Sequence, residues 1–148
     1  MAPTPRTLCM TVLLALAGFA LWVPAQAEAL GPNLLANDGF EVASRFEAWR
    51  WGATDPTRAT VTLDESVAHS GQRSARFHSE LPHAPNVYGG LSQVVRGIAP
   101  GSQYLIRLWA KGTKVGIVWF GGGPEWKARG GLPTGTFDWT PVELRWTA

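Results

Sequence analysis

The clearest structural signal in the sequence is in residues 97–111, which read GIAPGSQYLIRLWAK. Pro100 fixes its own φ and Gly101 accepts a positive φ, so this pair predicts a β-turn. After the turn, apolar and polar residues alternate with the period of a half-buried β-strand. One face carries Tyr104, Ile106, Leu108 and Ala110, and the other carries Leu105, Arg107, Trp109 and Lys111. The stretch therefore predicts a turn leading into a strand with one core face and one outer face.

Shorter runs on both sides of this stretch have the same character. The chain holds 17 Gly and 11 Pro, and it shows no sustained helical periodicity. Short alternating runs separated by turn residues are typical of antiparallel β-sandwiches and barrels. The runs expected to form strands are residues 58–63, 72–78, 104–111, 115–120 and 140–147. We therefore expect a single all-β domain with no internal repeat.

The N-terminus has the layout of a secretory signal peptide. A short stretch with one positive charge precedes the apolar run 8–23, and Pro24-Ala25-Gln26-Ala27 supplies a small-x-small cleavage pattern. A membrane anchor is the alternative, but the run is shorter than the ~20 residues that span a bilayer. We expect residues 1–27 to be removed and residues 28–148 to be secreted or periplasmic. The only cysteine, Cys9, leaves with the signal, so no disulfide is expected.

Composition and motifs argue against several function classes. The formal net charge is only +2, without the clustered Lys and Arg of a nucleic-acid surface. The sequence contains no nucleophile elbow, no His-Glu-x-x-His and no phosphate-binding loop. We interpret the three histidines, His69, His78 and His83, as surface or turn residues. No spacing selects a catalytic pair among the carboxylates of Glu47, Glu80, Glu125 and Glu143. We expect a non-catalytic, monomeric domain that binds no nucleic acid.

The tryptophans are the strongest functional signal. Of the eight in the chain, all but Trp22 follow residue 27. Trp109 lies between Arg107 and Lys111 on the polar face of its strand, where a core residue would not be expected. A flat indole face can stack on the C–H face of a pyranose while nearby polar groups bond its hydroxyls. Packing in the core is the alternative for each indole; we prefer it for Trp139 and Trp146 and leave both options open for Trp49, Trp51, Trp119 and Trp126.

Two turns offer oxygen atoms to a hard cation. Residues 37–41 read NDGFE, and residues 66–72 form a polar turn. Ca²⁺ binds carboxylates and turn carbonyls of this kind. Acidic residues in turns more often serve for capping or solubility, which is the alternative here.

Several short segments together resemble a known family. The opening NLLANDGFE at 33–41 followed by Trp49, HSGQRSA at 69–75, LSQVV at 91–95, IAPGSQYLIRLWAK at 98–111 and WTPV at 139–142 occur in that order. This series is similar to the CenC-type carbohydrate-binding modules of families four, nine and twenty-two. The matches cover nearly all of the chain after residue 27.

The resemblance implies an antiparallel β-sandwich, a galactose-binding-like jelly roll, that binds glycans without cleaving them. Members usually act as accessory modules of polysaccharide-degrading enzymes. The polysaccharide or oligosaccharide lies in a concave groove of the sheet, where Trp109 and Gln93 occupy matching strands. To these we add Arg107, from its face, and Trp49 and Trp119 as further aromatic candidates. A structural Ca²⁺ is expected near the opening strand, at Glu41 with backbone groups around Ser70.

The sequence departs from the family at its end. The family pattern continues for about one more strand beyond the WTPV segment, whereas this sequence ends at Ala148. We therefore expect either a C-terminally truncated sandwich or a sheet closed in another way, and an exposed edge strand in the first case. Two other functions stay open: a structural or adhesive sandwich that binds a protein or envelope component, and the accessory fragment of a glycoside hydrolase.

Overall fold

The computed structural model describes residues 30–42, 46–79 and 84–148. The chain divides into two compact units, Met1–Pro32 and Asn33–Ala148, and every strand of the described residues belongs to the second. The expected signal peptide, residues 1–27, lies outside the described residues, as do Glu80 and His83. Within the described part, no helix is long and apolar enough to cross a bilayer.

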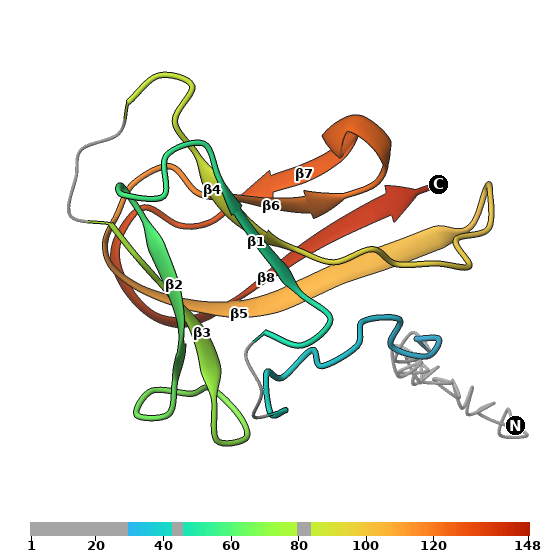
Figure 1. Ribbon diagram of the computed structural model, residues 1–148. Coiled ribbons are helices and arrows are strands. Elements are labelled where there is room, and N and C mark those ends of the chain that lie inside the picture. The colour runs from blue at the N-terminus through green and yellow to red at the C-terminus, as the bar shows by residue number, and fades with distance from the viewer. Residues whose placement is uncertain (1–29, 43–45, 80–83) are drawn as a thin grey trace, which may run out of the picture. The chain divides into compact units, whose positions relative to one another are not determined.

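The second unit is all-β, as the sequence predicts. Strands make up 46% of the described residues, and the helical content is one short 3₁₀ turn. The elements are β1 (Arg50–Ala53), β2 (Thr60–Asp64), β3 (Ser74–His78), β4 (Gly89–Ser92), β5 (Gln103–Val115), β6 (Trp119–Gly122), η1 (Pro124–Trp126), β7 (Ala128–Gly131) and β8 (Gly135–Thr147). The described strands pair antiparallel as four two-stranded sheets: β1–β4, β2–β3, β5–β8 and β6–β7 (Figure 1).

The longest sheet, β5–β8, has the expected two faces. The turn before β5 is confirmed, since Ser102 N–H donates to the Ala99 carbonyl at 3.2 Å and Gly101 has φ 76°. Every second residue from Tyr104 to Ala110 is half-buried or buried, while Arg107, Trp109 and Lys111 are exposed. Across the sheet, β8 sets its inward residues Val142, Leu144 and Trp146 opposite Leu108, Ile106 and Tyr104.

The prediction of one continuous strand over residues 115–120 is wrong. β5 ends at Val115 and β6 begins at Trp119, so the apolar run is divided between two sheets. The register of β5–β8 shifts twice before Val115, and Lys114 adopts a left-handed φ of 55°. Such irregularities bend a strand and end its pairing. As a result, Ile117 is 69% exposed instead of being part of a core.

The interior is shallow. Among the described residues only Ala110 and Ala128 are buried. Ring contacts add to the packing: the rings of Tyr104 and Trp146 lie 5.7 Å apart across β5–β8, and those of Trp51 and Phe77 lie 6.0 Å apart between β1 and β3. Most apolar side chains therefore keep some contact with water.

Candidate functional site

An exposed indole lies on the outer face of β5 between two ion pairs. Trp109 is 44% exposed. On one side, Arg107 Nε lies 2.6 Å from Glu143 Oε1; on the other, Lys111 Nζ lies 2.8 Å from Asp138 Oδ1. We call these five residues the Trp109 platform. Its charged side chains remain partly exposed, so they can form hydrogen bonds with a ligand as well as with each other.

The platform's carboxylate at Asp138 is held in its ionised form. Its hydrogen bond from Lys111 lowers the pKa of Asp138 below its ordinary value, and the Trp139 backbone N–H adds to the effect. The N–H donor lies 2.8 Å from the carboxylate oxygen. Asp138 is therefore an acceptor at neutral pH, not a proton donor.

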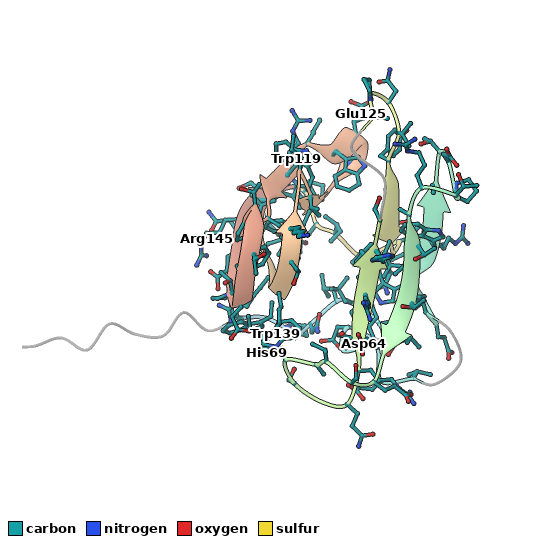
Figure 2. All side chains as sticks on the ribbon, turned by 90° about the vertical axis from the view of Figure 1, so that its left-hand side faces the viewer. Asp64, His69, Trp119, Glu125, Trp139 and Arg145 are labelled. Carbon is teal, nitrogen blue, oxygen red and sulfur yellow. The ribbon has the colours of Figure 1, made fainter. Side chains whose placement is uncertain are left out.

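A histidine covers part of the indole. His69, in the loop between β2 and β3, stacks on Trp109 with 3.9 Å between ring centroids and 13° between planes. The same imidazole meets the ring of Trp139 edge-on at 5.4 Å (Figure 2). One face of the Trp109 indole is thus occupied by a protein side chain. The sequence predicts a surface or turn position for His69, and no local pattern indicates this contact.

The proposed metal residue Glu41 does reach the Ser-Gly turn. Its Oε1 accepts hydrogen bonds from the backbone N–H groups of Gln72 at 2.9 Å and Arg73 at 3.2 Å. Arg73 Nη1 donates to the Glu41 carbonyl oxygen at 2.9 Å. Gly71 makes the approach possible, because a Cβ there would overlap Glu41 Oε1. The opening segment is therefore fastened to the β2–β3 loop.

This arrangement does not fit the expected calcium ion. Ca²⁺ takes six to eight oxygen ligands. The groups around Glu41 Oε1 are N–H donors, and a guanidinium lies on its carbonyl oxygen. Across the described ranges, no three His, Cys, Asp or Glu side chains come together as a metal-binding group. Ser70, which precedes Gly71 in the turn, is exposed to solvent. As arranged, Glu41 Oε1 serves as a hydrogen-bond acceptor that joins the opening segment to the β2–β3 loop.

Gln93 forms a brace. Its side-chain amide makes two hydrogen bonds to the backbone of Ala36, each of 2.8 Å: Nε2 donates to the carbonyl, and Oε1 accepts from the N–H. This is the pairing of a β-bridge made by a side chain. The polar atoms expected to bond a sugar are used to hold the opening segment.

Trp49 is also bonded to the opening segment, residues 33–41. Its Nε1–H donates to the Asn37 carbonyl at 3.0 Å, and its ring lies 5.6 Å from that of Phe40. The indole is half-buried. Its ring is engaged in packing and its indole N–H in a hydrogen bond within the protein.

Trp119 is displayed more openly than Trp109. It lies on β6, is 58% exposed, and has Arg129 Cζ 5.7 Å from its ring centroid. The predicted site residues therefore divide into three groups: Arg107 and Trp109 on β5, Trp119 on β6, and Gln93 and Trp49 bonded to the opening segment. Arg129 was not singled out from sequence, since only the hairpin register brings it to Trp119.

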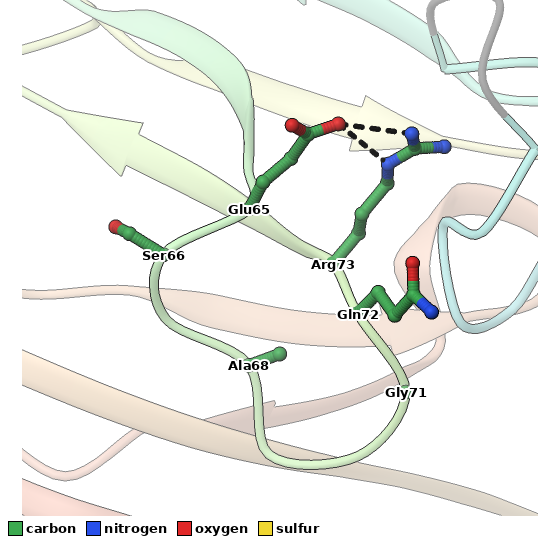
Figure 3. Close-up of a pocket in the computed structure, with 6 residues that line it drawn as sticks. All are labelled: Glu65, Ser66, Ala68, Gly71, Gln72 and Arg73. Carbon is green, nitrogen blue, oxygen red and sulfur yellow. Dashed lines mark hydrogen bonds and ion pairs between the residues drawn. The ribbon is translucent and has the colours of Figure 1, made fainter.

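A shallow hollow of about 550 Å³ lies in the β2–β3 loop. It is lined by Glu65, Ser66, Ala68, Gly71, Gln72 and Arg73 (Figure 3). Arg73 closes one side with an ion pair to Glu65, with Nη2 to Oε1 at 2.9 Å. The hollow contains no aromatic ring and no pair of carboxylates, so it offers neither stacking nor acid–base chemistry.

No protein-family model, curated protein or solved structure matches this chain.

Proposed function

We propose that the protein is an exported, non-catalytic carbohydrate-binding domain that binds a polysaccharide or oligosaccharide at the Trp109 platform. The observation that carries the proposal is an indole exposed on the outer face of a strand between two ion pairs. An indole stacks on the C–H face of a sugar ring, and the flanking charges can bond its hydroxyls. Such a surface binds sugars without needing a reactive group.

The resemblance to CenC-type modules supports the same proposal. It adds the finer fold, a β-sandwich of jelly-roll type, and the role of accessory module to a glycoside hydrolase. The layout of residues 1–27 supports secretion or a periplasmic location. We infer a monomer that binds without catalysis.

The His69 stack affects how a sugar could bind. An indole has two faces, and His69 takes one of them at 3.9 Å. The stack holds the Trp109 ring in a fixed orientation, so a ligand on the remaining face would not have to order it. Preorganisation of this kind raises affinity by lowering the entropy lost on binding. We expect dissociation constants on the order of 10 μM to 1 mM.

The test is a titration of the protein with soluble glucans, xylans and mannans, followed by tryptophan fluorescence and calorimetry. Trp109→Ala should weaken binding by roughly thirtyfold, the cost of losing an aromatic residue that dominates a binding surface. Trp126→Ala is the matched control, because it removes an indole of similar exposure, 55%, from the η1 turn. Equal binding by wild type and Trp109→Ala would remove this platform from the proposal.

A structural or adhesive domain that binds a protein or envelope component is the second candidate. The contact of His69 with Trp109 and Trp139 favours it, because that function calls for a loop covering Trp109, and His69 belongs to the β2–β3 loop. The cover is partial, since Trp109 is 44% exposed. The fluorescence titration separates the two candidates. A domain that responds to no glycan but is retained by cell envelope preparations would be of the second kind.

A further inference from the structure

The outer face of the β6–β7 sheet carries one ring and one cation, with Gly131 opposite the ring. In the sheet register Trp119 lies opposite Gly131, and Gly121 lies opposite Arg129. Trp119 and Arg129 are therefore diagonal neighbours, a separation that long side chains can bridge. Arg129 Cζ lies 5.7 Å from the Trp119 ring centroid, which is within the range of a cation–π contact.

The glycine opposite Trp119 leaves open space beside the indole. A Cβ built on Gly131 would meet only the Val118 carbonyl oxygen, at 4.0 Å. The other face of the same sheet is filled, since a Cβ on Gly130 would come within 2.8 Å of the Phe120 ring. Phe120 thus packs inward, whereas the space above Gly131, next to Trp119 in the sheet, is open.

No carboxylate in the described part of the chain neutralises the charge of Arg129. Among the described residues, no Asp or Glu oxygen lies within ion-pair distance of Arg129. Arg107 differs, because Glu143 lies 2.6 Å from it. An exposed guanidinium presents a planar pair of donors that matches the two oxygens of a carboxylate.

We propose that this face binds an acidic sugar, a hexuronate residue of a glycan. The pyranose C–H face packs on the part of the Trp119 indole that Arg129 leaves uncovered, beside Gly131, and the sugar carboxylate receives paired hydrogen bonds from the Arg129 guanidinium. The inference rests on the proposed carbohydrate-binding function and deepens it by naming the sugar class and a second subsite. Arg129 is the residue that selects for charge, and Trp119 is the residue that selects for a ring.

The experiment compares an oligogalacturonate with its methyl ester, which has the same rings without the charge. At low salt, calorimetry should show the acid bound at least about tenfold more tightly than the ester, because hydrogen bonds to charged groups are stronger than neutral ones. Arg129→Gln should abolish this preference. Arg50→Gln, which removes an exposed strand arginine on β1, should retain it and controls for net charge.

A second pair of variants tests the space beside the indole. Gly131→Val fills the open space next to Trp119. It should weaken binding of the oligogalacturonate by about tenfold or more and leave the circular dichroism spectrum unchanged. Gly90→Val is the matched control, because Gly90 is also an exposed strand glycine with open space around its Cβ position. It should bind as wild type does.

The outcomes separate this inference from the proposed function. Equal affinity for acid and ester, or a preference that survives Arg129→Gln, overturns the acidic subsite while neutral glycan binding at Trp109 would leave the function standing. Binding of sulfated but not carboxylated oligosaccharides also overturns it. Failure to bind any neutral or acidic glycan overturns both.

Discussion

Replacing Gly71 with alanine should separate two physical effects at one position. Gly71 has φ 68°, in the left-handed region, and its missing Cβ leaves room for Glu41 Oε1. That oxygen receives the two backbone N–H groups at 2.9 and 3.2 Å. The alanine variant must therefore strain the backbone and push the carboxylate off its donors.

The two costs can be estimated separately. A left-handed alanine costs roughly 1–2 kcal/mol. Losing the carboxylate's hydrogen bonds costs about 1–2 kcal/mol, less than the full value for charged groups, because Glu41 is exposed to water. Gly71→Ala should therefore lower the free energy of unfolding by about 2–4 kcal/mol.

Gly101→Ala is the matched control. Gly101 has φ 76°, but a Cβ there meets nothing within 4 Å, so only the backbone cost applies. Urea unfolding followed by circular dichroism should place Gly71→Ala about 1–2 kcal/mol below Gly101→Ala. In a Glu41→Ala background the two glycine variants should cost the same, which closes a double-mutant cycle. Equal losses of unfolding free energy for Gly71→Ala and Gly101→Ala in the wild-type background would refute the contact of the Glu41 carboxylate with the Gly71 turn.

Three further predictions concern the platform and the metal. His69→Ala removes two ring contacts worth about 0.5–1.5 kcal/mol each, so Tm should fall by several degrees and acrylamide should quench Trp109 more strongly; unchanged quenching would contradict the stack. The hydrogen bond from Lys111 lowers the pKa of Asp138 below its ordinary value of 3.8. The pair therefore stabilises the fold at pH values above 3.8, and this stabilisation is lost as the pH falls through the lowered pKa. The Tm difference between wild type and Lys111→Gln should therefore be positive at pH 7 and shrink in acid, whereas a constant difference would count against the pair. Millimolar Ca²⁺ or EDTA should leave Tm unchanged, because donors already occupy Glu41 Oε1; a rise with Ca²⁺ that Glu41→Ala abolishes would establish a metal site.

The sequence predicts the parts of the fold whose causes are local. The Pro100-Gly101 turn and the alternation after it depend on neighbouring residues, and the structure has both. The end of β5 at Val115 could not be predicted, because it follows from register shifts against β8 and the left-handed Lys114. An apolar run alone does not indicate where such an irregularity falls.

The candidate site follows the same division. The outward direction of Trp109 is predictable, since alternation fixes which face a strand residue occupies. The stack of His69 on it is not, because it joins the β2–β3 loop to β5, segments far apart in the sequence. The contact between Arg129 and Trp119 likewise needs the hairpin register to be known. Alternation identifies which side chains are displayed, but not what lies beside them.

The unequal lengths of the strand pairs have a consequence for the two subsites. β5 and β8 have 13 residues each, while β6 and β7 have four. We expect backbone amides of the long pair to be the slowest to exchange with deuterium and those of the short pair to exchange through local opening. A ligand on the long pair would leave the exchange rates nearly unchanged. A ligand on the short pair would slow exchange there, and it would spend part of its binding free energy on ordering that sheet.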